Sequence, residues 1–433
     1  MIEIQPVDVI DATVEVPGSK SLTQRALIAA ALARGTSRLV GPLASEDTAY
    51  TMAALRAMGI ACDDSDPRTW IVKGSGGVIK APEQDIFLGN NGTATRFLTS
   101  VAALGQGRFR ITGDERMAER PIAPLMEALR GWDVDIESDA DNGCPPLSIN
   151  GSGLAGGRTV LPEGRSSQYL SSLLLVAPYA RQQAELEVQG EVLSRPYVEM
   201  TLAVMADFGI RVEAAPSLTF FRIPQGCYQG MEYRIEGDAS GASYFWAAAA
   251  VTGGRVTVAN VPVPSLQGDA HLVPLLARMG CEVTKSGDGI TVEGPEKQKL
   301  SGIEVDMGNM PDVAPTLAVV AAFAEGTTVI NNVAHLRIKE CDRLSAMVTE
   351  LRKMGAEVEE EPDRMIIHGH GGRDLHGAEI ETYHDHRIAM CFGVAGLRVP
   401  GVRITGEDCV KKSFPDFWQR FDQLTDRPVV VRT

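Results

Sequence analysis

Hydrophobic and polar positions follow one another in a unit that recurs six times along the chain. Each unit opens with a polar turn, continues as a helix rich in Ala and Leu, ends at a glycine-type stop and then becomes a strand of alternating apolar and polar residues. The predicted strands cover residues 35–40, 107–112, 183–188, 254–259, 326–331 and 401–405. They begin 71 to 76 residues apart, so units of nearly equal length fill the chain.

Five of the six units contain a second predicted helix, which ends at an equivalent position in each unit. Its stop residues are Gly59, Asp133, Gly209, Gly280 and Gly355. Glycine, and Asp more readily than most residues, adopts the left-handed backbone that ends helices. The last unit runs through residues 413–424, and no strand is expected after it. The alternation of helices with strands predicts an α/β fold built from βαβ-like units.

Six units divide naturally into two domains of three units each. We expect one domain over residues 18–236 and the other over residues 237–433 together with residues 1–17. An opening strand within residues 3–16 precedes the first helix and is expected to complete the last unit. The chain would then cross between the domains twice, with the second junction near residues 234–238.

Composition narrows the class of protein. Of the 433 residues, 44% are hydrophobic and 22% are charged, as in a folded globular chain. There are 41 Lys and Arg residues against 56 Asp and Glu, and the net charge of −15 argues against a nucleic-acid or membrane partner. An anionic substrate would therefore need cations that cluster locally.

Targeting, cofactor and metal patterns are missing from the sequence. No segment reaches the ~20 apolar residues of a membrane helix and no signal peptide is visible, which predicts a cytoplasmic protein. Residues 151–156 satisfy G-x-G-x-x-G, but no helix is predicted after them, so we expect no dinucleotide. The seven cysteines are scattered, which predicts reduced thiols. His368 and His370 are expected in an exposed loop and His386 in a site, without metal or other cofactor.

Polar groups at the helix starts are the main functional signal. The first helices begin at residues 18–25, 89–96, 164–168, 237–240, 311–312 and 384–387. Helix N-termini offer N–H groups and a positive dipole end, which bind phosphate and carboxylate. The simpler interpretation is that Ser, Thr, Asn and Asp here are N-caps. Lys20, Arg25, Arg96 and Arg387 favour anion binding, because a cation in a first turn costs ~0.3–1 kcal/mol unless an anion accompanies it.

A series of motifs spread over the whole chain resembles one known family. The motifs are Pro17-Gly-Ser-Lys20-Ser21, Leu88-Gly-Asn90, Gly92-Thr93-Ala94, Arg116-Met-Ala-Glu-Arg120-Pro-Ile122, Ser166-Ser167-Gln168, Ser194-Arg-Pro-Tyr197, Glu236-Gly-Asp238-Ala-Ser240, Lys339-Glu340-Cys-Asp-Arg343, Asp385-His386-Arg387 and Lys412-Ser-Phe-Pro415. They are similar to the enolpyruvyl transferase family, in the branch that acts on shikimate 3-phosphate. The resemblance implies an α/β fold of two domains, each with three βαβαββ-type repeats, around an interdomain cleft.

The resemblance also implies an activity and its substrate-binding residues. The family transfers the enolpyruvyl group of phosphoenolpyruvate to the 5-hydroxyl of shikimate 3-phosphate and releases phosphate through a tetrahedral intermediate. Residues matching its phosphoenolpyruvate site are Lys20, Gly92, Arg120, Gln168, Arg343, Arg387 and Lys412. Residues matching its shikimate 3-phosphate site are Lys20, Ser21, Arg25, Ser166, Ser167, Gln168, Ser194, Tyr197, Asp312, His335 and Lys339.

The catalytic residues implied by the resemblance are Asp312, Glu340, Lys20, His386 and Lys412. Asp312 would contact the acceptor hydroxyls, and Glu340 with Lys20 would transfer protons. From the residues alone, Glu340 is equally an ion-pair partner of Lys339 or Arg343 on an exposed turn. Asp312 is equally a helix N-cap after Pro311.

Three positions depart from the family pattern. His335 stands where Asn is common, so one substrate contact would change with pH. Phe97 replaces a common Pro, and Asn91 replaces a small residue. Gly92 matches the glycine that leaves room for phosphoenolpyruvate and for the inhibitor glyphosate, which implies sensitivity to glyphosate.

Two other functions were weighed. A sibling enzyme of the same family acts on UDP-N-acetylglucosamine and typically carries a cysteine in the loop before the Arg-Pro pair. Here no cysteine lies between Cys62 and Cys144, which disfavours that acceptor. A sugar-phosphate sensor without activity would have little need for Asp312 and Glu340 beside its anions. We expect a monomer whose partners are its two small substrates.

Overall fold

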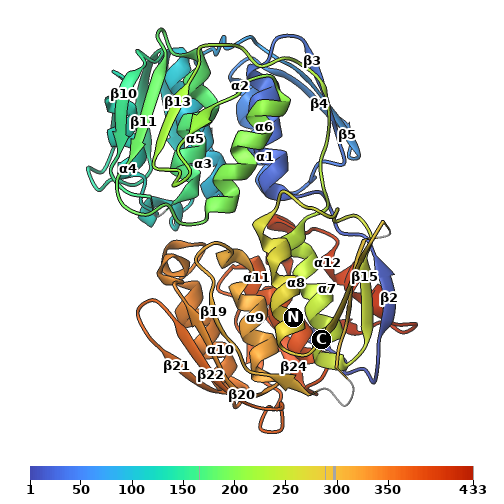
Figure 1. The fold of residues 1–433 in the computed structure, drawn as a ribbon. Coiled ribbons are helices and arrows are strands. Elements are labelled where there is room, and N and C mark those ends of the chain that lie inside the picture. The colour runs from blue at the N-terminus through green and yellow to red at the C-terminus, as the bar shows by residue number, and fades with distance from the viewer. Residues whose placement is uncertain (165, 288, 296–298, 433) are drawn as a thin grey trace. The chain divides into compact units, whose positions relative to one another are not determined.

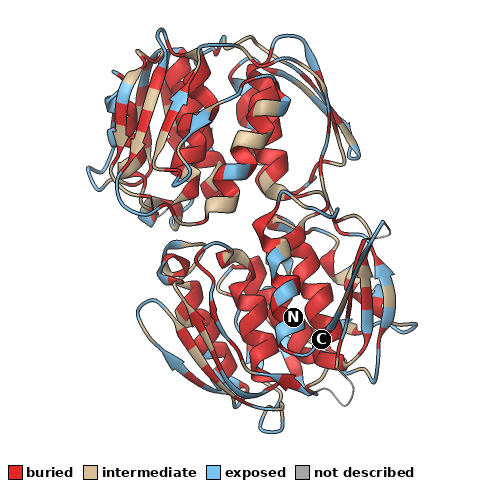
Figure 2. Cartoon of the chain, viewed as in Figure 1, coloured by how far each residue is buried: buried red, intermediate tan, exposed pale blue. Residues whose placement is uncertain are grey.

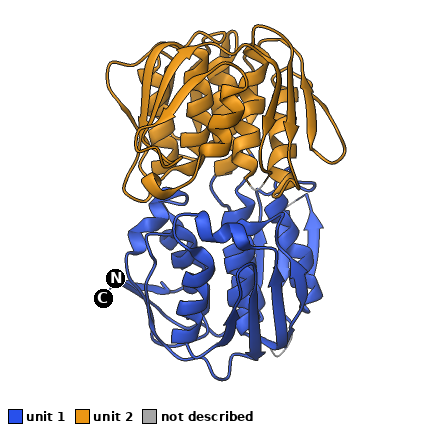
Figure 3. Ribbon diagram, turned by 90° about the vertical axis from the view of Figure 1, so that its left-hand side faces the viewer, with its two compact units in different colours: residues 1–17, 236–433 blue, residues 18–235 orange. Residues whose placement is uncertain are grey.

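The computed structural model describes residues 1–164, 166–287, 289–295 and 299–432. The chain divides into two compact units (Figure 3): unit 1 holds Met1–Pro17 and Glu236–Thr433, and unit 2 holds Gly18–Ile235. Each unit has its own sheets, helices and hydrophobic core. No helix among the described residues is long and apolar enough to cross a membrane.

Unit 2 combines six α-helices with three sheets of four strands in its described part (Figure 1). Its helices are α1 (Lys20–Leu32), α2 (Glu46–Ala57), α3 (Gly92–Leu104), α4 (Ala123–Arg130), α5 (Ser167–Val176) and α6 (Arg195–Asp207), with 3-10 turns at Met117–Glu119 and Ala177–Tyr179. Its strands are β3 (Thr36–Val40), β4 (Ala61–Asp66), β5 (Thr69–Lys73), β6 (Ile86–Phe87), β7 (Gln106–Thr112), β8 (Asp135–Ser138), β9 (Leu147–Ser152), β10 (Gly157–Leu161), β11 (Ala184–Val188), β12 (Glu213–Ala214), β13 (Phe220–Ile223) and β14 (Glu232–Arg234).

The three sheets of unit 2 share one topology. Their strand orders are β14-β3-β5-β4, β6-β7-β9-β8 and β10-β11-β13-β12. In each sheet the first two strands are parallel and the remaining pairs are antiparallel. Parallel neighbours need a crossover connection, and α3 and α5 supply it in the second and third sheets. The first sheet takes its parallel edge strand, β14, from the far end of the unit.

Unit 1 repeats this plan with segments from both chain ends. Its helices are α7 (Ala239–Thr252), α8 (Leu272–Arg278), α9 (Ala314–Ala322), α10 (Arg343–Lys353), α11 (His386–Gly396) and α12 (Phe417–Phe421), with 3-10 turns at Gly268–His271, Pro311–Val313, Ala334–Ile338, Glu407–Lys412 and Asp422–Leu424. Its strands are β1 (Ile2–Ile4), β2 (Asp11–Val14), β15 (Arg255–Val258), β16 (Glu282–Ser286), β17 (Gly289–Glu293), β18 (Leu300–Ser301), β19 (Glu304–Asp306), β20 (Ala324–Asn331), β21 (Glu357–Glu360), β22 (Met365–His370), β23 (Glu379–Ile380), β24 (Val402–Ile404) and β25 (Val430–Arg432).

The sheets of unit 1 correct three sequence expectations. The segment 3–16 forms two strands rather than one: β1 pairs with β24 and β25, whereas β2 pairs with β15 in another sheet. A strand, β25, also follows residues 413–424, where none was expected. These edge positions are filled by segments distant in sequence, which local patterns do not reveal. His368 and His370 lie on β22 rather than in a loop, and pair with Glu359 and Glu357.

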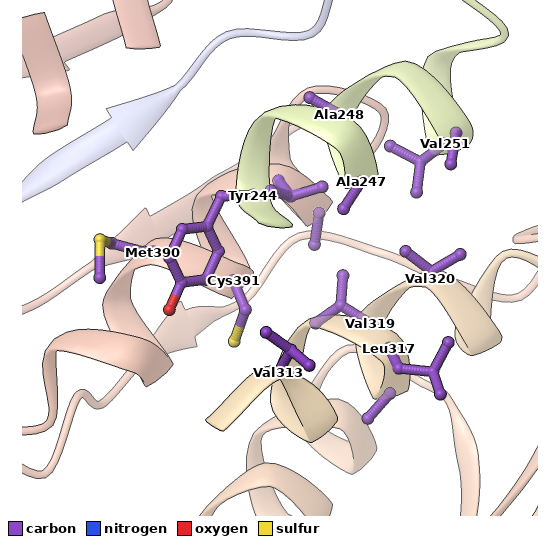
Figure 4. Packing of buried hydrophobic residues seen from close by; sticks show 14 of the residues in the cluster. Tyr244, Ala247, Ala248, Val251, Val313, Leu317, Val319, Val320, Met390 and Cys391 are labelled. Atoms are coloured by element: carbon purple, nitrogen blue, oxygen red, sulfur yellow. The ribbon is translucent and has the colours of Figure 1, made fainter. Parts of the chain in front are cut away.

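Inner helices carry the core of each unit (Figure 2). In α1, α3, α5, α7, α9 and α11 nearly every residue beyond the first turn is buried. A helix that is apolar on all sides must be covered on all sides. Figure 4 shows how Tyr244 of α7, Leu317 of α9 and Cys391 of α11 contribute to one such packed cluster. Because their flanks are covered, these helices present their polar groups mainly at their first turns.

The helix stops agree with their predicted backbone. Gly59, Asp133, Gly209, Gly280 and Gly355 all have positive φ values, between 60° and 113°. Each stop therefore ends its second helix in the left-handed conformation and turns the chain back toward the sheet.

Candidate active site

In unit 2, the N-termini of four helices meet. Gln168, at the start of α5, donates its Nε2 to the Oγ1 of Thr93 in α3 over 3.0 Å. Asn91, which precedes α3, donates its Nδ2 to the carbonyl of Asp47 in α2 over 2.7 Å. The Nζ of Lys20, the first residue of α1, lies 3.2 Å from the Asp47 carboxylate. The first turns of α1, α2, α3 and α5 therefore share one end of the unit.

The N-cap interpretation holds for some of these residues and not for others. The Ser19 side chain accepts from the backbone of α1, and Asn91 accepts from the backbone of α3 over 3.0 Å. Ser166 precedes α5 and makes no side-chain capping bond to it. Ser194 precedes α6 with a left-handed backbone, φ 54°, and likewise makes no capping bond. Two predicted substrate-binding serines are thus not explained as helix caps.

Two buried guanidinium groups face Gly92 at the start of α3. Arg120 donates to the carbonyl and to the Oδ1 of Asn90, over 3.1 and 2.8 Å. Arg96 donates to the carbonyls of Gly92 and Pro121, over 3.1 and 2.9 Å. Burial first and the charge of Arg120 second lower the pKa of Arg96 to about 10, so it stays protonated at neutral pH. Among the described residues, no carboxylate forms an ion pair with Arg96 or Arg120.

The absence of a side chain at Gly92 is required by the packing of these two arginines. A Cβ at this position would lie 2.5 Å from the Nη2 of Arg120 and 2.9 Å from the Nη1 of Arg96. The missing side chain therefore makes room for the two guanidinium groups themselves. The sequence indicated Arg96 as an anion-binding cation and Gly92 as space for phosphoenolpyruvate, but it did not reveal that the two residues pack against each other.

Arg25 is a third buried cation of unit 2. Its Nε donates to Thr201 over 2.7 Å and its Nη2 to Ser171 over 3.1 Å. The carbonyls of Ser21 and Tyr197 accept from its other donors, over 3.0 and 3.1 Å. Burial lowers the pKa of Arg25 to about 10. No described carboxylate forms an ion pair with it.

In unit 1, Asp312 is the centre of an ion-pair network. It lies in the turn before α9, and its Oδ2 accepts from Arg387 over 2.7 Å. Its Oδ1 accepts from Arg343 over 3.3 Å and lies 4.0 Å from the Nζ of Lys339. Asp312 caps no helix, so the N-cap interpretation is wrong for this residue.

Glu340 belongs to the same network. Its Oε2 accepts from Arg343 over 2.7 Å, and its Oε1 lies 3.9 Å from the Nζ of Lys412. The sequence alternative of an ion pair with Arg343 is confirmed, but the exposed turn is not, because the Glu340 side chain is only 10% exposed. The carboxylate is therefore held in a largely dry position between an arginine and a lysine.

Asp385 links the network to α11. It caps the helix by accepting from the backbone of Arg387 over 2.9 Å, and its other oxygen accepts from the Nε of Arg343 over 2.8 Å. His386 follows it, fully buried, with its Nδ1 3.8 Å from Asp385. Burial alone would lower the pKa of Arg343, but Asp385, Glu340 and Asp312 together raise it. Asp385 stood in a recognised motif, yet only the structure shows this bridging contact.

His335 corrects the expected pH dependence. Its side chain is buried in the turn Ala334–Ile338, and neither ring nitrogen has a hydrogen-bond partner in the described part of the chain. Burial first, and the charge of Lys339 next, lower the pKa of His335 to about 3. The imidazole is therefore neutral throughout the physiological range in this state.

The structure thus assembles the predicted residues in two groups. Lys20, Gly92 and Gln168 lie at the helix starts of unit 2, Arg120 faces Gly92, and buried Arg25 donates to the carbonyls of Ser21 and Tyr197. Asp312, Lys339, Glu340, Arg343, Arg387 and Lys412 form one continuous network in unit 1. No group of three or more His, Cys, Asp and Glu side chains among the described residues is arranged to hold a metal ion.

Comparisons with known proteins match nearly the whole length of the chain. A family model described as EPSP synthase (3-phosphoshikimate 1-carboxyvinyltransferase) matches residues 4–421. The 3-phosphoshikimate 1-carboxyvinyltransferase of Nostoc punctiforme is 44% identical over 96% of this chain and 97% of its own length. The enzyme of that name from Haemophilus ducreyi is 44% identical over 98% of each chain.

Solved structures agree in fold. EPSP synthase from Acinetobacter baumannii superposes with a TM-score of 0.82 and 29% identity, covering 99% of this chain and 98% of its own. The enolpyruvyl transferase NikO from Streptomyces tendae superposes with a TM-score of 0.77 at 19% identity, covering 98% and 97%, which supports the fold alone.

Proposed function

The chain belongs to the EPSP synthase family, and from this premise we propose how its side chains carry out the family's reaction. The protein transfers the enolpyruvyl group of phosphoenolpyruvate to the 5-hydroxyl of shikimate 3-phosphate. Phosphate leaves through a tetrahedral intermediate, and the product continues along the shikimate pathway to aromatic amino acids. The acceptor is therefore shikimate 3-phosphate rather than a nucleotide sugar.

Phosphoenolpyruvate brings a carboxylate and a phosphate, and several cations are needed to bind both groups. We assign Lys20, Arg120 and Gln168 of unit 2 and Arg343, Arg387 and Lys412 of unit 1 to this substrate. Arginines can bind either anionic group with two parallel hydrogen bonds, and lysines act as point charges. The lack of a carboxylate partner for buried Arg120 supports the assignment, since an uncompensated buried cation is costly unless an anion joins it.

Shikimate 3-phosphate brings a second phosphate, a carboxylate and ring hydroxyls. We assign Ser21, Arg25, Ser166, Ser167, Gln168, Ser194, Tyr197, Asp312, His335 and Lys339 to it, with Lys20 shared between the substrates. Arg25 already donates four hydrogen bonds within the protein, so at most one of its five N–H groups remains for the substrate. Neutral His335 has both ring nitrogens available to its ligand.

The chemistry needs a base for the 5-hydroxyl proton and an acid for the methylene carbon. We propose Asp312 as the group that contacts the hydroxyls and takes the proton. It now binds Arg343 and Arg387, so phosphoenolpyruvate must take over these arginines before Asp312 can act. Glu340 with Lys20 would transfer the proton to and from carbon, while His386 and Lys412 stabilise developing charge.

Three further properties follow as proposals from family membership and composition. The protein acts as a monomer in the cytoplasm, and glyphosate inhibits it.

One observation carries the residue assignment: buried Arg25 and Arg120 of unit 2 have no described carboxylate partner, whereas unit 1 holds two carboxylates of the predicted chemistry among its cations. The test is phosphate release from phosphoenolpyruvate with shikimate 3-phosphate, UDP-N-acetylglucosamine or no acceptor. Asp312→Ala and Lys20→Met should abolish release that depends on shikimate 3-phosphate. Lys412→Met should lower it strongly, whereas Lys411→Met, next to it but 60% exposed, should not. Equal effects of the two neighbouring lysines would contradict the assignment.

A further inference from the structure

The turn that enters α11 has an unusual backbone. Tyr383 and His384 follow one another with φ values of 52° and 54°. This left-handed region is unfavourable for residues with a Cβ, and two such residues in succession need contacts that hold them there. The next residues are Asp385, His386 and Arg387. The strained pair therefore sets the direction in which the first turn of α11 leaves the sheet.

Glu350 of α10 accepts two hydrogen bonds from this turn. Its side chain is completely buried. One carboxylate oxygen accepts from the Tyr383 hydroxyl over 2.7 Å, and the other accepts from the backbone N–H of Glu381 over 3.2 Å. The third donor is the Nζ of Lys353, 2.9 Å away on the same helix. A buried carboxylate needs such donors, and the turn before α11 supplies two of the three.

The same helix holds the turn at a second point. Arg343, seven residues before Glu350 and therefore on the same face of α10, donates its Nε to Asp385 over 2.8 Å. The strained pair is thus attached to α10 at two points: Tyr383 binds Glu350, and Asp385, directly after the pair, binds Arg343. Only the second attachment belongs to the ion-pair network of the candidate active site.

We propose that Glu350 and Tyr383 are positioning residues of the reaction, whose hydrogen bond keeps residues 383–384 left-handed and so aims His386 and Arg387. Neither residue is among those that we assign to a substrate. The inference rests on the proposed contact of Arg387 with phosphoenolpyruvate. The affinity for phosphoenolpyruvate would then depend on Glu350 and Tyr383 as well as on the residues that contact this substrate.

The protonation state of Tyr383 supports a lasting hydrogen bond. Burial first, and the hydrogen bond to Glu350 next, raise the pKa of Tyr383 above its usual value. The phenol therefore remains a donor at any pH used to assay the enzyme. Lys353 is partly exposed and contacts Glu350 without touching the turn, so it provides a matched control for the charge of Glu350.

The central experiment compares steady-state kinetics of Tyr383→Phe with those of Tyr228→Phe. The second variant also removes one buried hydroxyl, which donates to the carbonyl of Leu175 in unit 2 over 2.8 Å. Losing the Tyr383 bond should raise KM for phosphoenolpyruvate about tenfold, as expected for one hydrogen bond near a charged partner, with KM for shikimate 3-phosphate within about twofold. Tyr228→Phe and Lys353→Met should leave both KM values unchanged.

Two rescue variants separate positioning from general damage. Glu350→Gln keeps an oxygen for the Tyr383 hydroxyl and should retain most of the phosphoenolpyruvate affinity that Glu350→Ala loses. His384 is exposed, and Asn tolerates the left-handed backbone, so His384→Asn should partly restore the affinity of Tyr383→Phe. A normal KM for phosphoenolpyruvate in Tyr383→Phe overturns the inference. Equal rises of both KM values without rescue overturn it as well.

A separate variant identifies which proposal has failed. Arg387→Lys keeps the charge but loses the planar pair of donors. An unchanged KM for phosphoenolpyruvate in Arg387→Lys overturns the assigned role of Arg387, and the inference with it. A raised KM in Arg387→Lys together with a normal one in Tyr383→Phe overturns the inference alone.

Discussion

The substitution Gly92→Ala tests the packing around Arg120, a residue of unit 2 that we assign to phosphoenolpyruvate. The added Cβ would lie 2.5 Å from the Nη2 and 2.8 Å from the Cζ of Arg120, whereas ordinary contact begins at 3.4 Å. The guanidinium must therefore retreat by roughly 1 Å, about the displacement at which a charge-assisted hydrogen bond loses its geometry. The hydrogen bonds from Arg120 to Asn90 resist this movement, and Arg96 restricts it further, with its Nη1 2.9 Å from the same Cβ.

The magnitude follows from the bond that is lost. A hydrogen bond to a charged group contributes about 1.5–3 kcal/mol, which corresponds to a rise of roughly 10- to 150-fold in KM for phosphoenolpyruvate. KM for shikimate 3-phosphate should stay within about twofold, because the assigned contacts of that substrate do not include Arg120. Stability should not fall, since the Gly92 backbone is not left-handed and Ala is a better helix residue by up to ~1 kcal/mol.

The assay is steady-state phosphate release with each substrate varied in turn, alongside thermal unfolding. Gly287→Ala is the control, because a Cβ at that position meets no atom within 4 Å. A KM for phosphoenolpyruvate within twofold of the unchanged protein would refute the packing argument. So would a parallel rise in both KM values, since that result indicates general damage to unit 2.

Three other predictions concern single residues. Asp312→Asn removes the carboxylate that now binds Arg343 and Arg387, so calorimetry should show phosphoenolpyruvate binding about tenfold more tightly, although turnover is lost. The control Asp342→Asn, which keeps its helix cap, should change neither the affinity nor the turnover. Weaker binding of phosphoenolpyruvate to Asp312→Asn would contradict this competition between the carboxylate and the substrate. Phe97→Leu removes an aromatic ring whose centre lies 5.4 Å from the Arg25 guanidinium. It should raise KM for shikimate 3-phosphate about threefold to tenfold and leave KM for phosphoenolpyruvate unchanged. Equal rises of the two KM values would indicate a loss of packing instead. For His335 the folded pKa of about 3 lies below the ordinary value of 6.5, so its neutral form supports stability above pH 6.5, and that support is lost as pH falls toward 3. The free energy of unfolding of His335→Asn, measured by urea titration, should therefore decline less steeply with falling pH than that of the unchanged protein, by up to about 1.4 kcal/mol per pH unit. Parallel curves would show that His335 is not the group responsible.

The repeat could be predicted because its signals are local. Strands at 35–40, 107–112 and 183–188 in unit 2 were visible from alternation alone, and the observed β3, β7 and β11 agree with them within a residue. Helix stops such as Gly59 and Asp133 depend only on the conformational freedom of one residue. Motifs at the helix starts likewise predicted cations and carboxylates near the helix N-termini.

The sequence by itself therefore determined the α/β class, the six repeats and the family, since each depends on local periodicity or on ordered motifs. Only the tertiary structure decided which partners meet. Asp312 proved to be an ion-pair bridge to Arg343 and Arg387, which lie 31 and 75 residues away, rather than a cap for its own helix. The pairing of β1, β2 and β25 and the buried contact between Glu350 and Tyr383 likewise join segments far apart in the chain. Hydrogen bonds and ion pairs act over a few ångströms in space, and their strength depends on burial, so no local pattern along the chain can specify them.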